Sequence, residues 1–247
     1  MTKKIALVTG ASRGLGAEIA RGLAADGWAV AVNYHADTAG AEAVVASIHA
    51  AGGRAVAARF DVTDEASVRD GLATIAARLG PVDLIVNNAT GPQPMMPIME
   101  QSWEHHLDQL RFFVKAPLLL LQALLPDWRA RKAGRVIHIG SEVVDIGNSN
   151  FGHYVSAKGA MLGLTRSWAS ELGPEGICVN LVAPGWIPVE RHAGTPEQEY
   201  ATYRALTPLR RQGSPADVAG MVRFLASPAA DFITGQTFSV NGGRTLA

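Results

Sequence analysis

The chain has 247 residues, 48% of them apolar, and its 22 Lys and Arg balance its 22 Asp and Glu, so the formal net charge is zero. This size and apolar fraction suit one α/β domain with a large core, and no linker, repeat or low-complexity tract divides the sequence. The neutral charge argues against nucleic acid as the main partner, because phosphate binding usually requires an excess of basic residues.

The most apolar stretch, residues 114–125, contains Lys115, Pro117 and Gln122 and is too short to span a bilayer. The N-terminal residues lead directly into a strand pattern and lack the apolar region of a signal peptide. The single cysteine, Cys178, lies in an apolar run, so we expect it to be buried and to form no disulfide within the chain. We therefore expect a soluble cytoplasmic protein.

Strand and helix patterns alternate along the chain. Short runs of apolar and β-branched residues predict strands at 4–9, 28–33, 54–60, 82–87, 134–140, 176–182 and 236–240. Helical patterns occupy 14–26, 38–51, 64–79, 101–129, 152–173 and 214–226. Strands that are apolar throughout suit a parallel sheet covered on both faces. The alternation predicts an α/β protein with a single-domain Rossmann fold, a doubly wound seven-stranded parallel sheet with helices on both faces and ligands beyond the carboxyl ends of its strands.

A glycine-rich turn follows the first predicted strand. Its sequence is Thr9-Gly10-Ala11-Ser12-Arg13-Gly14-Leu15-Gly16, and a helical pattern begins within it. Glycines allow the backbone to approach a pyrophosphate closely, and a helix N-terminus supplies free N–H donors. The spacing G-x-x-x-G-x-G matches the dinucleotide fingerprint G-x-G-x-x-G only in part, and a plain tight turn is the alternative.

A tyrosine and a lysine four residues apart stand on the helix predicted at 152–173. Tyr154 and Lys158 would lie on one face of this helix, with the ammonium beside the phenol. A free phenol has a pKa of about 10, and a nearby cation lowers that pKa towards the range useful for proton transfer. Ser141, at the end of the preceding strand, can hold a substrate oxygen against the same phenol. The pattern indicates acid–base chemistry on a carbonyl or an alcohol.

Together these segments resemble the short-chain dehydrogenase/reductase family over the whole chain, most closely its 3-oxoacyl-carrier-protein reductases. Further matching motifs are Asp61-Val62, Asn87-Asn88-Ala89, the run from Val179 to Gly185, Gly235-Gln236 and the run from Val240 to Gly243. Sugar, polyol and steroid dehydrogenases share these motifs, so the resemblance leaves the substrate open.

The resemblance implies a nicotinamide cofactor. The implied cofactor-binding residues are Gly10, Ser12, Arg13, Leu15, Gly16, Asn33, Tyr34, His35, Asp61, Val62, Asn88, Ala89, Thr90, Tyr154, Lys158, Pro184, Gly185 and Ile187. Among these, Asp61 is expected to accept a hydrogen bond from the adenine amino group, and a helix N-cap is its alternative role.

The end of the second predicted strand bears on the choice of cofactor. Enzymes selective for NAD usually place a carboxylate there, on the ribose 2′-hydroxyl, whereas this chain has Asn33-Tyr34-His35. Arg13 can meet a 2′-phosphate with a charge-assisted fork, or it is a solvated loop arginine. We expect NADP(H) to be preferred, with NAD(H) also possible.

The resemblance further implies hydride transfer between the cofactor and a carbonyl–alcohol pair. Ser141 would polarise the carbonyl, Tyr154 would transfer the proton, and Lys158 would bind the nicotinamide ribose and lower the tyrosine's pKa. The implied substrate-binding residues are Ser141, Val143, Tyr154 and Trp186. Apolar side chains on the surrounding loops favour an apolar substrate such as a 3-oxoacyl thioester or a bulky ketone.

Two positions depart from the family pattern. Thr90 replaces a glycine, although Gly91 follows it, and Phe113 stands where the family usually has an asparagine that holds a water in a proton relay. Gln109, one turn earlier, is a possible substitute for that asparagine. These departures leave room for a second hypothesis, a nucleotide-binding sensor or scaffold with little turnover, while the intact Ser141, Tyr154 and Lys158 favour an enzyme.

The segment 186–213 interrupts the alternation, with a helical stretch near 196–206. In the family such an insertion forms a mobile substrate lid, and a structured excursion without a gating role is the alternative. Family members pair helices equivalent to 101–129 and 152–173, so we expect a homotetramer. His105 and His106 lack the spacing and the carboxylate partner of a metal site, and we expect no metal.

Overall fold

The computed structural model describes residues 4–246. Its seven strands form one sheet in the order β3-β2-β1-β4-β5-β6-β7, and all neighbours are parallel. The strands are β1 (Ile5–Val8), β2 (Ala29–Tyr34), β3 (Arg54–Arg59), β4 (Leu84–Asn87), β5 (Gly134–Ile139), β6 (Ile177–Pro184) and β7 (Thr237–Val240). The predicted seven-stranded Rossmann-like α/β fold is confirmed, and each strand overlaps its predicted range.

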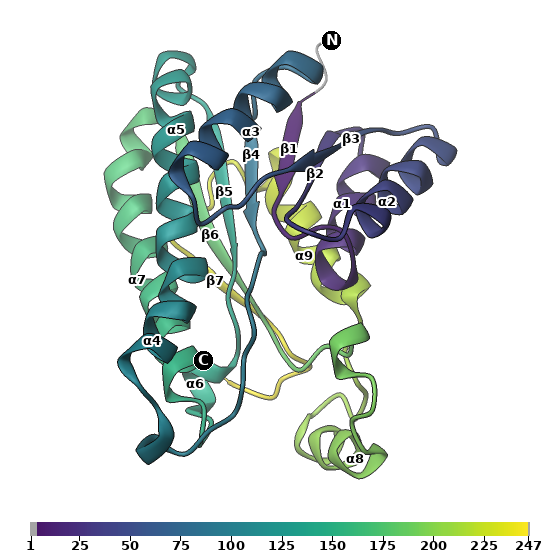
Figure 1. Ribbon diagram of the computed structural model, residues 1–247, viewed down its shortest axis with the longest axis vertical. Helices are drawn as coiled ribbons and strands as arrows, with labels where there is room; N and C mark the ends of the chain where they lie inside the picture. Colours follow the sequence, from purple (N-terminus) through teal and green to yellow (C-terminus); the bar gives the residue numbers. More distant parts are fainter. Residues whose placement is uncertain (1–3, 247) are drawn as a thin grey trace.

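Two helical layers cover the sheet because successive side chains of each strand point to opposite faces. On one face, residues such as Val8 and Val30 pack against α1 (Gly14–Ala25), α2 (Thr38–Ala50) and α9 (Pro215–Ala226). On the other face, residues such as Leu7 and Val136 pack against α3 (Glu65–Arg78), α5 (Ala116–Arg131) and α7 (Gly152–Leu172). The two layers lie on opposite sides of the sheet in Figure 1. This double cover explains why the strands carry few polar residues.

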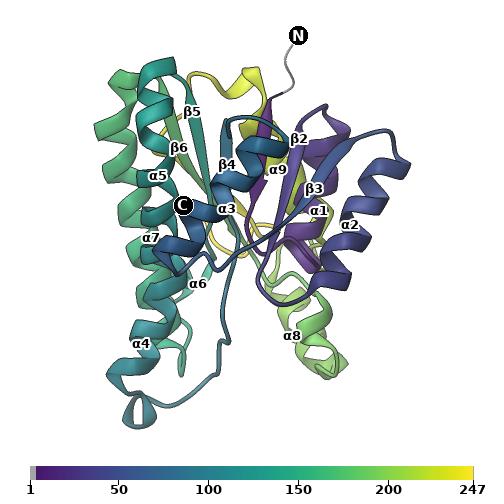
Figure 2. The same ribbon diagram turned by 45° about the horizontal axis from the view of Figure 1, so that its top comes forward.

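The remaining helices lie beyond the carboxyl end of the sheet. They are α4 (Trp103–Leu110), α6 (Val143–Ile146) and α8 (Glu197–Leu206), with the short turns η1 (Ile98–Glu100) and η4 (Glu190–His192). Two other short turns, η3 (Gly173–Glu175) and η5 (Pro228–Ala230), lead into β6 and β7 at the amino end of the sheet. Figures 1 and 2 show α8 and the loop before α4 extending past the carboxyl end of the sheet. The sequence motifs predicted to form the site lie at this same end of the sheet.

The helix predicted at 101–129 is not continuous. A π-helical turn, η2 (Arg111–Lys115), separates α4 from α5. A π-helical turn bonds residues i and i+5 in place of i and i+4, so it takes an additional residue without ending the helix. Periodicity alone does not reveal it, because apolar residues on both sides continue the helical pattern.

Two further observations concern single residues, and the first departs from the prediction. Cys178 is half-buried and not buried as expected, because the segment after α9, with Asp231 O 3.9 Å from its Sγ, covers it only in part. Gly134 opens β5 because a Cβ there would lie 2.2 Å from Cε3 of the fully buried Trp128. No helix within the described residues is long and apolar enough to cross a membrane.

Candidate functional site

The glycine-rich turn lies between β1 and the N-terminus of α1. Gly14 has a φ of +56°, which favours glycine, and it is the first residue of α1. A Cβ at Gly16 would lie 2.5 Å from both the Asn88 side chain and Gly10 O. Glycine at these two positions therefore permits the tight course of this loop, which lies at the N-terminus of α1, the end of the helix whose first N–H groups have no intrahelical partners.

Asn88 fixes the shape of the loop. Its Nδ2 donates to Thr9 O at 2.8 Å and to Gly10 O at 3.1 Å, while Thr9 Oγ1 accepts from the backbone N of Asn88 and of Ala89. Thr90 is exposed beyond them, and the following glycine is required by packing, since a Cβ at Gly91 would lie 2.6 Å from the Phe112 ring. The Asn-Asn-Ala motif at the end of β4 thus holds the glycine-rich turn in place.

The side chain of Asn33 is used within the protein. Its Oδ1 accepts from Gly10 N at 3.2 Å, and its Nδ2 donates to Ala58 O and Phe60 O. With an exposed fraction of 2%, this side chain holds the glycine-rich turn against β2 and β3. We expected Asn33 to contact the cofactor, and the structure leaves its polar side-chain atoms no free position for that contact.

The carboxylate that follows the end of β2 is engaged at the N-terminus of a helix. Asp37 caps α2, where its side chain accepts from Gly40 N. Arg13 is exposed, and within residues 4–246 it forms no ion pair. Arg59, which the sequence interpretation did not consider, donates from Nε to His35 O at 3.3 Å and brings a second guanidinium to this corner.

Asp61 does not cap a helix. Asp64 caps α3 by accepting from Ser67 N, so the alternative N-cap role for Asp61 is wrong. The Oδ1 of Asp61 accepts from the backbone N and the hydroxyl of Thr63, both at 2.8 Å. Its second carboxylate oxygen forms none of the hydrogen bonds within the described residues and remains available at the edge of the loop.

Ser141, Tyr154 and Lys158 meet at the carboxyl end of β5. Tyr154 is the third residue of α7, and Lys158 follows one turn later, as the spacing predicts. The Lys158 Nζ donates to Ile139 O at 2.6 Å and lies 5.6 Å from the centroid of the Tyr154 ring. Ser141 comes two residues after β5, and its hydroxyl lowers the pKa of the Tyr154 phenol.

Burial dominates the ionisation of this group. It raises the pKa of Tyr154, while the charge of Arg191 and the Ser141 hydroxyl lower that pKa in part. It also lowers the pKa of Lys158 well below its usual range, and Arg191 lowers it further. The pKa of the phenol is therefore above its ordinary value, opposite to the direction expected from Lys158, because desolvation of the phenolate outweighs the nearby charges.

Phe113 lies against both catalytic candidates. Its ring is 1% exposed, packs edge-to-face on Tyr154 with centroids 5.5 Å apart, and has the Lys158 Nζ 3.7 Å from its centroid. Gln109 does not take the place of the missing asparagine. Its Nε2 donates to Pro92 O at 2.8 Å, and its Oε1 has no partner within the described residues.

The segment after β6 is tied to the loop that carries Ser141. Tyr203 on α8 donates to Oε1 of the buried Glu142 at 2.8 Å and accepts from Trp186 N at 2.9 Å. Trp186 stacks on Tyr200, with ring centroids 4.8 Å apart. Burial raises the pKa of Glu142, and the Tyr203 hydroxyl lowers it in part. The Glu142 side chain therefore anchors α8.

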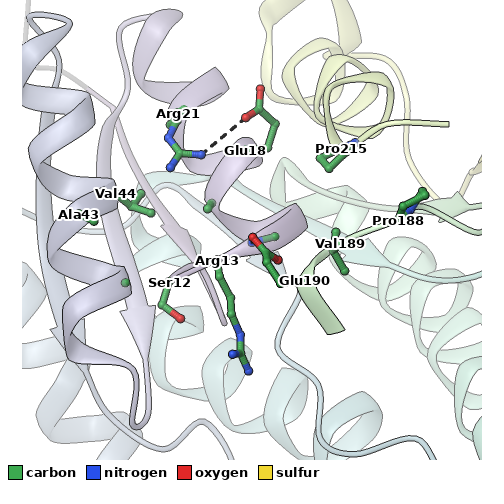
Figure 3. Close-up of a pocket in the computed structure, with 13 residues that line it drawn as sticks. Ser12, Arg13, Glu18, Arg21, Ala43, Val44, Pro188, Val189, Glu190 and Pro215 are labelled. Atoms are coloured by element: carbon green, nitrogen blue, oxygen red, sulfur yellow. Dashed lines mark hydrogen bonds and ion pairs between the residues drawn. The ribbon is translucent and has the colours of Figure 1, made fainter. Parts of the chain in front are cut away.

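A cleft of about 450 Å³ lies between the first turn of α1, the start of α2 and the segment 188–190. Figure 3 shows Glu190 beside the first turn of α1 and Arg13 extending away from the ion pair of Glu18 and Arg21. The Oε1 of Glu190 accepts from Gly14 N at 3.3 Å. The Glu190 carboxylate therefore accepts a hydrogen bond from an N–H group that a cofactor phosphate would use.

No group of three His, Cys, Asp or Glu side chains suited to a metal occurs in residues 4–246. His105, His106 and His153 do lie together, with ring centroids 6.2–6.4 Å apart for the pairs that include His153. Burial lowers the pKa of His153, and the two neighbouring histidines add to this effect.

Known proteins share this architecture along the whole chain. A family model described as enoyl-(acyl carrier protein) reductase matches residues 10–245. A 3-oxoacyl-(acyl-carrier-protein) reductase of Staphylococcus aureus is 39% identical over 248 residues, which is 100% of this chain and 99% of that protein. A reductase of the same description from Synechocystis sp. is 37% identical, over 100% of this chain and 98% of its own length.

Among solved structures, a blue fluorescent protein from a metagenomic library, crystallised with NADPH, is 37% identical and superposes with a TM-score of 0.89 over 98% of both chains. The matches extend over the glycine-rich turn, the Ser141, Tyr154 and Lys158 positions and the last strand. The chain belongs to the short-chain dehydrogenase/reductase family and is an NAD(P)-dependent oxidoreductase.

Proposed function

We propose that this protein reduces a ketone to a secondary alcohol with NADPH, with Tyr154 as the general acid. The observation that carries the proposal is the convergence of Tyr154, Lys158 and Ser141 at the carboxyl end of β5, at the same edge of the sheet as the glycine-rich turn that begins α1. The names of the relatives support a 3-oxoacyl thioester as the substrate.

The bound cofactor supplies the hydride, and the chain supplies position and proton transfer. The Ser141 hydroxyl donates a hydrogen bond to the carbonyl oxygen, which makes the carbonyl carbon more electrophilic. The phenol of Tyr154, which is protonated at neutral pH and whose pKa burial raises further, would deliver its proton to the substrate oxygen as that oxygen gains negative charge. Lys158 places its charge beside the resulting phenolate and binds the ribose of the cofactor.

The choice of NADPH over NADH rests on charge at the end of β2. Arg13 is unpaired within the described residues, Arg59 lies beside His35, and Asp37 is engaged as a cap. A 2′-phosphate at this corner would meet two cations and the N-terminus of α2. The NADPH complex of a similar protein supports the same choice.

The substrate side is formed by Ser141, by Val143 on α6, and by Trp186, whose indole stacks on α8. We propose that the segment 186–213 acts as the lid over this side. At the end of α5, Arg129 is paired with Glu175 and Arg131 with Asp83 and Asp127. An acidic carrier protein docking there would have to displace these carboxylates, so we expect small-molecule thioesters to be reduced as well as carrier-bound ones.

We also propose a homotetramer. Phe224 on α9 and Phe232 after η5 are large apolar side chains with exposed fractions of 40% and 105%. A second copy that packs there would bury them. Light scattering that gives a stable monomer would remove this part of the proposal.

The decisive experiment follows NADPH absorbance with a panel of ketones and 3-oxoacyl thioesters. Tyr154→Phe should lower turnover by about 10²–10⁴-fold, the usual contribution of general acid catalysis, and leave NADPH binding largely intact. Ser156→Ala, which removes a hydroxyl from the same helix, is the control and should keep full turnover. A Tyr154→Phe protein with near-normal turnover would exclude the role of Tyr154. NADPH binding without turnover on any substrate would favour the sensor hypothesis.

A further inference from the structure

The ammonium of Lys158 has an unusual set of neighbours. The lysine is 4% exposed, and within residues 4–246 no carboxylate forms an ion pair with it. Of its three N–H groups, one is donated to Ile139 O at 2.6 Å. The ring of Phe113 takes a second side, with the Nζ 3.7 Å from the ring centroid.

The position of the Phe113 ring is determined by packing. The residue lies in the π-helical turn η2, is 1% exposed, and belongs to an apolar cluster that includes Ala157 and Met161 of α7. Its edge-to-face contact with Tyr154 restrains the ring from another direction. The ring is thus a rigid wall of the site, and the lysine side chain is placed against its face.

An aromatic face attracts a cation, and the attraction is strongest where water is excluded. Burial opposes the charged form of Lys158. The charged or titratable groups that face it from other elements are His138 on β5 and Arg191 in η4, and neither is an anion. Among the described neighbours only the Phe113 ring, the phenol of Tyr154 and the Ile139 carbonyl can favour the ammonium.

We propose that Phe113 is a positioning residue that keeps Lys158 protonated and directs its remaining N–H group towards the cofactor ribose. This inference rests on the role given to Lys158 in the proposed function. The family resemblance places an asparagine with a relay water at this position, whereas the aromatic ring here stabilises the lysine directly and excludes water from that side. The ring face then substitutes for a polar acceptor.

The ionisation of Lys158 tests this inference without any turnover. The sequence contains five lysines, namely Lys3, Lys4, Lys115, Lys132 and Lys158. With lysine labelled by ¹³C at Cε, NMR can therefore follow each titration, and the signal of Lys158 is assigned by its loss in Lys158→Met. In Phe113→Leu the pKa of Lys158 should fall by about one to one and a half units, the equivalent of a desolvated cation–π contact.

Two comparisons separate the ring's electrostatics from its volume. Phe112→Leu removes an aromatic ring from the same turn that contacts Gly91, and it should leave the pKa of Lys158 unchanged. Placing 3,4,5-trifluorophenylalanine at position 113 keeps the shape of the ring, weakens its negative face and should lower the pKa of Lys158 by an intermediate amount. This variant also serves if Phe113→Leu does not fold.

An unchanged pKa of Lys158 with the fluorinated ring, or equal shifts in the Phe112 and Phe113 variants, would overturn the inference. Titrating NADPH over the same pH range adds a second readout, because NADPH affinity of Phe113→Leu should fall at a lower pH than that of the wild type. If the NMR shift appears but no carbonyl is reduced, the contact stands and the proposed reaction fails.

Discussion

Removing the charge of Glu190 should tighten binding of the cofactor. Its Oε1 accepts from Gly14 N at 3.3 Å, at the N-terminus of α1 where the diphosphate is expected. Cofactor phosphate and carboxylate would then compete for one N–H group or remain within about 5 Å of each other. At that distance two like charges in water repel by about 0.8 kcal/mol, and the exposure of Glu190 makes the water value appropriate.

Glu190→Gln removes this repulsion and keeps a side chain of the same shape. A gain of about 0.8 kcal/mol corresponds to roughly fourfold tighter NADPH binding. Fluorescence titration should show the gain at low salt and show it shrinking at high salt, because the Debye length falls from about 10 Å at 0.1 M to 3 Å at 1 M. Glu18→Gln is the matched control, since Glu18 lines the same cleft and pairs with Arg21. Equal or weaker NADPH binding by Glu190→Gln would refute the competition.

Three other predictions concern separate parts of the site. Arg13→Ala should raise the Kd for NADPH by about tenfold or more and leave the Kd for NADH unchanged. Binding titrations of the wild type and the variant with each cofactor measure this difference. Tyr203→Phe leaves Trp186 N without its acceptor and should cost about 1–3 kcal/mol in urea unfolding, with KM rising more than kcat falls. Burial lowers the pKa of His138 to about 3, so the unfolded chain takes up a proton between pH 6.5 and 3 that the folded chain does not. The free energy of unfolding should therefore decrease as the pH is lowered through this range, by about 3 kcal/mol from pH 6.5 to 4. Urea titrations at the two pH values measure this change, and His138→Gln should abolish most of it.

The fold was predictable because its determinants are local. Seven short apolar strands alternate with helices, and connections between parallel strands are almost always right-handed crossovers. These two facts leave few possible topologies for the sheet. Asp64 and Ser214, which cap α3 and α9, are the first residues of the predicted helices. The spacing of Tyr154 and Lys158 also predicts their shared helical face, since it depends only on helix geometry.

The features that sequence did not reveal depend on contacts between distant segments. The internal hydrogen bonds of Asn33 join β2 to Gly10 and to the end of β3, so a side chain expected at the cofactor is used by the loop. The direction of the pKa shift of Tyr154 depends on how deeply three elements bury it. Arg59 and Glu190 belong to no sequence motif. A role can be assigned to each only from the residue of a distant segment that it contacts in the fold.

The short turn η4 connects the two ends of the site. Glu190 reaches the glycine-rich turn, and the next residue, Arg191, acts electrostatically on Tyr154 and Lys158. This turn therefore supplies a carboxylate to the N-terminus of α1 and a positive charge to the catalytic candidates, so the segment after β6 contributes charge to both ends of the site.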